Sequence, residues 1–235
     1  MHSRSVRIPR RRLFIAALAV VAACGVTDPT GGLPPGDAQL AVLNALPEGT
    51  VAALLLDDVP MTVPAGGQRI SRVVPAGEHR LEARATGGRI LASAQFAVGA
   101  GGRRTAIIGG SIVGGAALVV AADTASLPAA GEVKVRIVNS VPGTPALEAW
   151  LARAGQLVDS TARIVSPLAY GADLRGGLPG YALRGAGSYQ VRVTDLVTGT
   201  TQAQRVVALG SGEVWSVVLI RRGDGELELV PIEET

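Results

Sequence analysis

The chain has 235 residues, of which 48% are hydrophobic, 17% are charged and only 3% are aromatic. Its formal net charge is +3, but five of its 22 basic residues lie within the first twelve positions, and the rest of the chain carries 17 bases against 19 acids. Net charge governs attraction to polyanions, so this balance argues against a nucleic-acid partner, as does the lack of a basic stripe with interleaved aromatic residues. The 31 glycines and 14 prolines interrupt short aliphatic runs, which favours strands and turns over helices.

The N-terminus combines a basic segment with a short apolar run that ends at Cys24. Residues 1–12 hold five arginines and no acid, and Leu13–Cys24 is apolar throughout. This order is that of an export signal, and the run is too short to cross a bilayer, which takes about 20 apolar residues. The four residues that end at Cys24, Val-Ala-Ala-Cys, resemble the bacterial lipobox, in which the cysteine thiol is acylated. We expect residues 1–23 to be a lipoprotein signal peptide and Cys24 to be the lipidation site.

The export route and the destination leave alternatives open. A plain secretory signal cut near Ala23 would leave Cys24 as a free thiol, which is a liability in an oxidising compartment. Residues 11–15, Arg-Arg-Leu-Phe-Ile, resemble a twin-arginine export motif, so both the Sec and the twin-arginine routes remain open. The residue after the cysteine is Gly25; by resemblance to the sorting rule of enteric bacteria, this favours the outer over the inner membrane. We predict an exported protein that is lipid-anchored to the bacterial cell envelope, with residues 24–37 as a flexible tether rich in Pro and Gly.

Two segments of the remaining chain repeat each other. Gln-Leu-Ala-Val-Leu-Asn-Ala-Leu-Pro at 39–47 matches Lys-Val-Arg-Ile-Val-Asn-Ser-Val-Pro at 134–142, an offset of 95. Farther along, Pro75–Leu81 matches Gly185–Val191 at an offset of 110, so the second repeat carries an insertion, which we place near Ile164–Gly180. Similarity of this kind indicates two tandem copies of one domain.

Apolar and polar residues alternate with a period of two within each repeat. In the clearest case, Val133, Val135 and Ile137 alternate with Lys134 and Arg136. Such alternation is typical of half-buried antiparallel strands, and roughly six or seven of them per repeat, without a helical stretch, indicate a β-sandwich. We predict an all-β protein of two tandem immunoglobulin-like or transthyretin-like antiparallel β-sandwiches, at 38–126 and 132–235.

One segment admits a second interpretation. Thr105–Ala122 is 18 residues without a charge, and its run Gly-Ser-Ile-Val-Gly fits a small-residue packing motif of transmembrane helices. The equivalent segment of the second repeat, Ser216–Val230, contains five charged residues, which does not suit a membrane helix. We therefore expect a hairpin, with strands near Thr105–Ile108 and Ala116–Ala121 around a Gly-rich turn.

Three short motifs are shared by the repeats. They are Asn-Ser/Ala-x-Pro at the end of the opening strand, Pro/Gly-Ala-Gly-x-His/Tyr before a later strand, and Gly-x-x-Trp/Arg-Ser/Thr at the start of a closing strand. Together they resemble the bacterial extracytoplasmic family called domain of unknown function 4397, over nearly all of 38–235 as two copies. The resemblance implies an exported protein with immunoglobulin-like or transthyretin-like sandwiches, and it supplies no catalytic residues.

Little in the sequence points to catalysis, a metal or a cofactor. After Cys24 the chain has a single histidine, His79, whose counterpart in the second repeat is Tyr189, so we interpret it as a packing residue rather than a catalytic base. The pair Asp57-Asp58 precedes Val-Pro, and we interpret it as a hairpin turn rather than a calcium site. We predict no enzyme activity, no metal and no cofactor, with a periplasmic hydrolase based on the histidine as the alternative.

The aromatic residues gather in the second repeat, which also holds the insertion. Phe96 is the aromatic residue of the first repeat, whereas both tryptophans and all three tyrosines belong to the second. Long loops on a rigid scaffold often carry function, and aromatic side chains are favoured at contact surfaces. We predict Tyr170, Asp173, Arg175 and Tyr181 as contacts to a partner, an envelope protein or a glycan, on a non-catalytic binding or structural module that its lipid anchor holds at the membrane.

Overall fold

The computed structural model describes residues 35–111, 115–123, 126–156, 160–171 and 180–234. The predicted signal peptide and Cys24 lie outside these residues. The described chain is built from strands, with two short 3-10 turns at Thr86–Gly88 and Ser160–Ala162. No helix in the described part of the chain has the length and apolar character needed to cross a membrane. The prediction of an all-β protein is confirmed.

Within the described residues each repeat contributes eight strands, somewhat more than the six or seven expected. The strands of the first repeat are β1 (Asp37–Asn44), β2 (Ala53–Leu56), β3 (Val59–Met61), β4 (Gln68–Pro75), β5 (Gly77–Arg84), β6 (Ile90–Val98), β7 (Arg103–Ser111) and β8 (Gly115–Ala122). Those of the second are β9 (Glu132–Asn139), β10 (Leu147–Arg153), β11 (Arg163–Val165), β12 (Ala182–Gly185), β13 (Gly187–Asp195), β14 (Thr201–Leu209), β15 (Val214–Arg221) and β16 (Leu227–Glu233).

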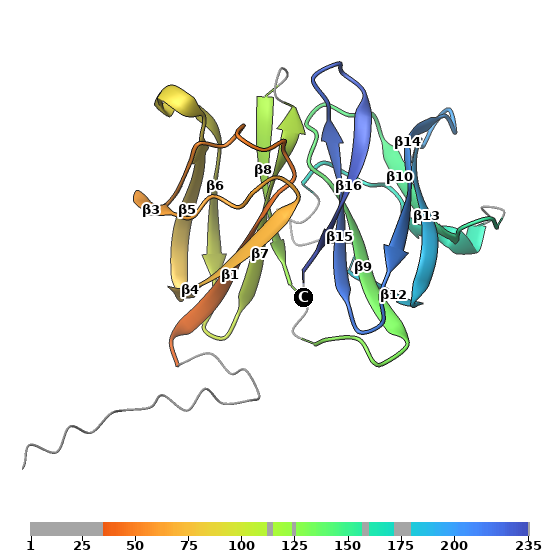
Figure 1. Cartoon of the computed structure of the whole chain (residues 1–235), viewed down its shortest axis with the longest axis horizontal. Helices are drawn as coiled ribbons and strands as arrows, with labels where there is room; N and C mark the ends of the chain where they lie inside the picture. Colours follow the sequence, from red (N-terminus) through yellow and green to blue (C-terminus); the bar gives the residue numbers. More distant parts are fainter. Residues whose placement is uncertain (1–34, 112–114, 124–125, 157–159, 172–179, 235) are drawn as a thin grey trace, which may run out of the picture. The chain divides into compact units, whose positions relative to one another are not determined.

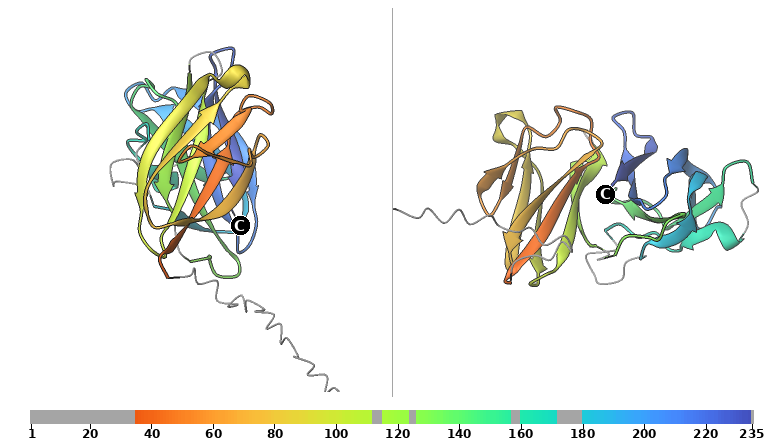
Figure 2. Two further views of the ribbon diagram at one scale, coloured as in Figure 1. Left: turned by 90° about the vertical axis from the view of Figure 1, so that its left-hand side faces the viewer. Right: turned by 60° about the horizontal axis from the view of Figure 1, so that its bottom comes forward.

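Each repeat folds into two four-stranded sheets, and the strand order is the same in both repeats. In the first sandwich the sheets are β4-β1-β7-β8 and β3-β2-β5-β6, and in the second they are β12-β9-β15-β16 and β11-β10-β13-β14 (Figures 1 and 2). The first strand of each repeat thus lies beside the fourth. In the immunoglobulin arrangement the first strand lies beside the second instead. The prediction of two β-sandwiches is confirmed, and of its two versions the transthyretin-like one describes them better.

One strand pair in each sandwich is parallel. β1 pairs with β7 in parallel, with Gln39 opposite Arg103, and β9 pairs with β15 in parallel, with Lys134 opposite Val214. The other pairs between these strands are antiparallel, as expected. The sequence did not indicate the parallel pair, because side chains alternate with a period of two in a strand of either direction.

A separate apolar core fills each sandwich. Leu40 and Val42 of β1 face inward and meet Leu54 and Leu81 of the opposite sheet. The second core is built in the same way around β9, whose inward side chains include Val135. Each Val or Leu side chain that is fully removed from water contributes about 1.5–3 kcal/mol. Because the chain has a single cysteine, no disulfide within it can add to the stability that these aliphatic cores supply.

Backbone conformation confirms the predicted turn residues. Asp57 and Asp58 join β2 to β3 with φ angles of 51° and 65°, the left-handed pair that a two-residue hairpin turn requires. Gly77 and Gly187, at the starts of β5 and β13, have φ angles of 152° and 151°. Side chains rarely adopt such angles, so glycine is needed at both equivalent positions.

The insertion of the second repeat is divided between two connections. Equivalent strands start 95 residues apart at β1 and β9 and 104 apart at β3 and β11, and Gly187 lies 110 residues after Gly77. Two residues join β2 to β3, whereas residues 154–162 join β10 to β11. The expected position near Ile164–Gly180 therefore accounts for only the later part of the insertion.

The uncharged segment Thr105–Ala122 forms the predicted hairpin, β7 with β8. Its strands are buried on both faces: Ile108 packs in the core of the first sandwich, whereas Ile107 belongs to an apolar cluster with Val138 and Val218 of the second. A strand that is buried on both faces has a nearly continuous apolar sequence. This double burial explains a composition that resembles that of a membrane segment.

The two sandwiches come close together at Gly109 of β7. A Cβ atom on this glycine would lie 2.0 Å from Oγ and 2.6 Å from Cβ of Ser140. The Ser140 hydroxyl donates to the Leu219 carbonyl at 2.7 Å and accepts the Gly110 N–H at 3.2 Å. Close packing between the sandwiches thus requires glycine at position 109.

Candidate functional site

His79, the histidine of the described chain, is buried at the start of β5. Its Nδ1 lies 2.7 Å from Oδ2 of Asp57, and its Nε2 lies 2.8 Å from the carbonyl oxygen of Pro75. Burial by itself would lower the pKa of His79, but the bonds to Asp57 and to the Pro75 carbonyl outweigh it and raise the pKa. Because a carbonyl oxygen can only accept, Nε2 carries a proton. Both ring nitrogens are therefore engaged with backbone or turn groups of the protein itself.

Asp57 completes this arrangement from the β2–β3 turn. Its Oδ1 accepts the backbone N–H of Arg80 at 2.7 Å, while its Oδ2 meets His79. Burial would raise the pKa of Asp57, but the bonds from Arg80 and His79 lower it. This carboxylate thus fixes the turn against β5.

Tyr189 makes the equivalent contact in the second sandwich. Its hydroxyl donates to the carbonyl of Gly185, four residues earlier, at 2.6 Å, as His79 does to Pro75. A tyrosine and a histidine thus perform the same backbone bond at equivalent positions. This equivalence supports the interpretation of His79 as a structural residue.

The four predicted contact residues occupy different environments. Asp173 and Arg175 lie outside the described residues. Tyr170 is exposed, and its backbone bridges to Asn139 at the end of β9. Tyr181 is half-buried, and its hydroxyl donates to Oε2 of Glu234 at 2.7 Å. The hydroxyl of Tyr181 is therefore already engaged within the protein.

Tyr181 belongs to a buried polar network centred on Arg136 of β9. The arginine side chain is fully buried, and its Nε donates to Oγ of Ser216 at 2.7 Å. Its Nη2 donates to Oε1 of Glu234 at 2.8 Å and to Oδ1 of Asp123 at 3.2 Å. The guanidinium carbon also lies 4.7 Å from the centre of the Tyr181 ring. Arg136 is thus saturated with partners.

The network joins the two sandwiches, because Asp123 follows the last strand of the first. Oδ2 of Asp123 accepts the hydroxyl of Thr105 in β7 at 2.6 Å. Burial raises the pKa of Asp123, and the nearby Arg136 offsets only part of that effect. Burial also raises the pKa of the Tyr181 hydroxyl. We interpret the network as a structural contact, since its polar atoms bond to one another.

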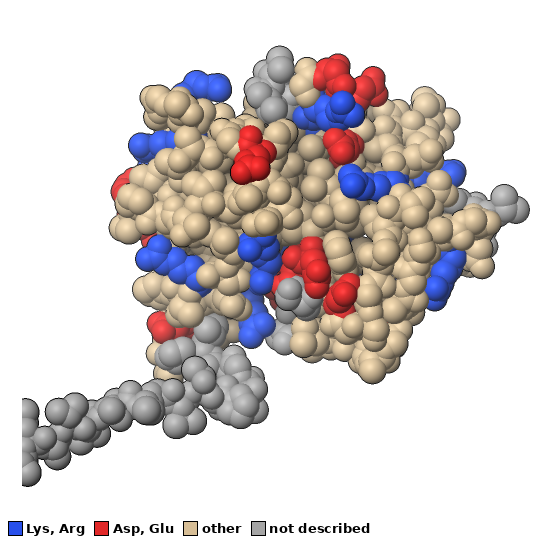
Figure 3. Space-filling model, viewed as in Figure 1, with Lys and Arg blue, Asp and Glu red and all other residues tan. Residues whose placement is uncertain are grey.

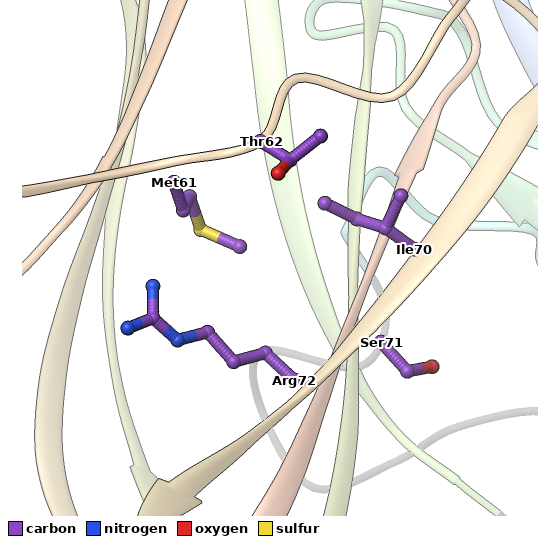
Figure 4. A pocket seen from close by; sticks show the side chains of 5 residues that line it. All are labelled: Met61, Thr62, Ile70, Ser71 and Arg72. Carbon is purple, nitrogen blue, oxygen red and sulfur yellow. The ribbon is translucent and has the colours of Figure 1, made fainter.

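A pocket of about 380 Å³ opens at one edge of the first sandwich, where the two sheets part. β3 and β4 are the end strands of the two sheets on this side. Met61 and Thr62 line the pocket from the end of β3, and Ile70, Ser71 and Arg72 line it from β4 (Figure 4). Figure 4 shows the Arg72 guanidinium directed toward Met61. The pocket thus combines apolar walls, two hydroxyls and one cation.

Arg72 lies on the core face of its strand. It is paired with Leu40 of β1, and Leu40 is completely buried in the core. Directly opposite residues share one face of a sheet, so the arginine stem follows the core face to the open edge. Within the described residues, no hydrogen bond or ion pair reaches the guanidinium. Its charge is therefore available to a ligand.

The second sandwich has a more open pocket of about 300 Å³ near β11, lined by Arg163, Ile164, Val165 and Ser166. Here the arginine is engaged. Its Nη1 lies 3.6 Å from Oε2 of Glu148, and its guanidinium carbon lies 5.7 Å from the Trp150 ring centre. The first sandwich therefore offers the better candidate for binding an anionic group.

Other charged side chains form small groups of mixed sign on the face drawn in Figure 3. Arg205 lies 3.4 Å from Glu228, and Arg222 lies 3.3 Å from Asp224. Exposed pairs of this kind contribute about 0–1 kcal/mol each. Among the residues that the structure describes, His, Cys, Asp and Glu side chains form no group of three or more suited to a metal ion.

The Asn-x-x-Pro motif has the same structural role in both sandwiches. Oδ1 of Asn44 accepts the N–H of Leu46 at 3.1 Å, and Oδ1 of Asn139 accepts the N–H of Val141 at 3.0 Å. The Asn44 amide also donates to the Pro64 carbonyl at 2.9 Å, which ties the end of β1 to the loop before β4. A shared fold and shared turn chemistry thus define the two halves as sandwiches of one type.

The family comparison agrees with this description. Residues 38–150 match the model of the family described as Domain of unknown function (DUF4397). The match covers the first sandwich together with β9 and the first part of β10 of the second, and it confirms the family resemblance for this part of the chain. No curated protein matches the chain. The description of the family assigns no activity, so a function has to be inferred from the site.

Proposed function

We propose that this protein is a non-catalytic binding or structural module of the bacterial cell envelope, attached to the membrane by a lipid on Cys24. The observation that carries the non-catalytic part is the environment of His79. Its two nitrogens are engaged with Asp57 and Pro75, and Tyr189 makes the equivalent bond in the second sandwich. A hydrolase of the serine type would need this histidine as a free base, so the hydrolase alternative is not favoured.

The N-terminal sequence supports the envelope location. A basic segment, a short apolar run and a lipobox-like ending precede Cys24, and residues 24–37 are long enough to hold the sandwiches away from a membrane. We also infer that the second sandwich is a second copy of the same family domain, since it shares the strand order and the asparagine contacts of the first. The outer membrane is the proposed destination.

Substitution of the anchor residue tests the attachment. Cys24→Ser should leave an uncut precursor or release the protein from the membrane fraction, whereas Thr27→Ala, a matched change in the tether, should behave as wild type. Mass spectrometry of the wild-type N-terminal peptide should find the acyl groups. Equal fractionation of all three proteins, with no lipid on Cys24, would show that the anchor does not exist.

Capture of a partner from native envelope with the full chain tests the binding role. The proposed contacts are Tyr170, Asp173 and Arg175, in and beside the inserted loop, whereas the hydroxyl of Tyr181 is already bonded to Glu234. Leu168 is 1% exposed, so excising residues 166–180 would damage the core, and the deletion should be limited to 172–179. Unchanged recovery of the partner by a folded deletion variant would remove this loop as the contact.

A further inference from the structure

Within the described residues, β4 has a long strand edge to which no strand is paired, although β16 of the second sandwich approaches it. It ends the sheet β4-β1-β7-β8, is eight residues long and pairs along its whole length with β1. The Ala76 N–H donates to the Gly36 carbonyl at 2.8 Å, which sets the alternation of the antiparallel ladder. By that alternation, residues 70, 72 and 74 direct their backbone groups to β1. The backbone groups that point away from the sheet belong to Arg69, Ser71 and Val73.

The other end strands of the sheets on this side of the two sandwiches are less suited to pair with a further strand. β3 and β11 have three residues each and β12 has four, and β3 contains Pro60. Short strands and prolines are known protections against strand addition. On the opposite side of the first sandwich, β6 and β8 lie against each other. Among the described strands, β4 therefore combines length, an edge to which no strand is paired, and an adjacent pocket.

We propose that β4 binds an extended acidic segment of a partner protein by strand addition. This inference rests on the proposed function as a binding module, and it specifies the chemistry of the partner. A strand added to β4 pairs its backbone with Arg69, Ser71 and Val73. The partner residue opposite Arg72 then belongs to a pair without backbone hydrogen bonds, in which side chains lie closest. Its side chain faces the pocket lined by Met61.

The side chains of β4 define the sequence that fits. Among the residues that the structure describes, none pairs with the Arg72 guanidinium, which favours an acidic residue opposite it. Ile70 and Val74 flank Arg72 on the same face of β4, and Val74 is 2% exposed. Apolar residues are therefore favoured at the two positions of the partner segment that lie opposite them. The expected pattern is apolar-x-acidic-x-apolar, and because it is symmetric it fits a segment that runs in either direction.

Charge also decides between this partner and a second copy of the chain. Arg72 is exposed, and within the described residues no hydrogen bond or ion pair reaches its guanidinium. A second β4 strand paired symmetrically about Arg72 would place its own Arg72 opposite the first. Like charges placed opposite each other destabilise strand pairing.

Binding of two blocked, fluorescent peptides to the full-length protein in detergent tests the proposal. The probes are TVTETVT and TVTKTVT, which differ only in the sign of the central charge. The glutamate peptide should bind roughly three- to tenfold more tightly, and Arg72→Glu should reverse this order. Arg89→Glu makes the same charge change at an exposed position before β6 and should leave the order unchanged.

Hydrogen exchange locates the peptide. The amides of Arg69, Ser71 and Val73 should exchange more slowly with the glutamate peptide bound, because they gain partners. Ser71→Pro removes one outward N–H without removing a bond to β1 and should weaken binding about tenfold or more. If this variant fails to fold by circular dichroism, the exchange pattern of the wild type still decides.

Equal affinity for the two peptides, or protection at other amides, overturns the proposal. The proposal is also overturned if the three amides are protected in the absence of peptide and lose this protection when the protein is diluted. That result would assign the β4 edge to a second copy of the chain. If the peptides do not bind but the envelope capture recovers a partner, this inference is wrong and the proposed function stands. If capture also fails, the proposed function fails with it.

Discussion

Replacing Arg136 with methionine tests the polar network between the sandwiches. Methionine keeps much of the side-chain volume and removes the charge. The arginine is fully buried, and the side chains of Asp123 and Glu234 are 10% and 6% exposed. The substitution leaves two buried carboxylates without their cation, and breaking a buried ion pair in this way costs about 3–5 kcal/mol. The fold by itself does not need a cation here, because the equivalent residue of the first sandwich is the buried Ala41.

Thermal unfolding followed by circular dichroism measures the effect. For a folded part of this size, a change of 1 kcal/mol shifts the midpoint by about 2–4 °C, so Arg136→Met should lower it by roughly 6–20 °C. The control is the neutral combination of Arg136→Met with Asp123→Asn and Glu234→Gln. It should recover most of the loss, because no uncompensated buried charge remains.

Two results would refute this reasoning. One is an Arg136→Met midpoint within about 2 °C of the wild type. The other is a triple variant that is no more stable than the single one, which would assign the loss to packing rather than to charge.

Three further predictions concern pH and packing. The pKa of His79 is raised, so the bonds of its protonated ring stabilise the fold fully below pH 6.5, the ordinary pKa. This stabilisation is lost as the pH rises through the folded-state pKa. His79→Tyr keeps the bond to Pro75 and should remove this decline of the unfolding midpoint with pH. The pKa of Asp123 is also raised, so ionisation of this carboxyl group costs stability above pH 3.8. Unfolding midpoints measured across pH should show Asp123→Asn to be more stable than the wild type near neutral pH and equally stable in acid. Gly109→Ala should lower the free energy of unfolding by about 1–3 kcal/mol in urea titrations, because its Cβ collides with Ser140, and adding Ser140→Gly should restore part of the loss.

Each of these has an outcome that contradicts it. An unchanged pH profile in His79→Tyr would show that another group titrates, and a less stable Asp123→Asn at neutral pH would show that the carboxylate is needed in its charged form. A Gly109→Ala variant as stable as the wild type would mean that the sandwiches can separate there without cost.

Much of the fold follows from local patterns in the sequence. Period-two alternation indicates strands because successive side chains point to opposite faces, and the repeated motifs show that the pattern occurs twice. The Asp57-Asp58 turn and the conformations of Gly77 and Gly187 are also local, because they depend on which residues tolerate unusual backbone angles. These properties belong to a few neighbouring residues, so the sequence was sufficient to predict them.

The candidate binding edge was not predictable in this way. Arg72 sits among polar and apolar residues that alternate poorly, and nothing local indicates that β4 ends its sheet. The parallel pairing of β1 with β7 decides that order, because it places β7 on one side of β1 and leaves β4 on the other. Pairing joins residues far apart in the chain, and single-sequence periodicity contains no information about it.

The sequence by itself determined the strands, the repeat and the predicted envelope address, while the tertiary structure decided what each face contacts. Arg136 alternates with core residues of β9, which from the sequence places it on the outer face of a half-buried strand. It is fully buried, because Asp123 of the first sandwich and Glu234 enclose it. The uncharged part of β7 and β8, from Thr105 on, is apolar on both faces for the same reason. Alternation shows which side chains share a face, and only the packing of one sheet on another shows whether water or protein covers that face.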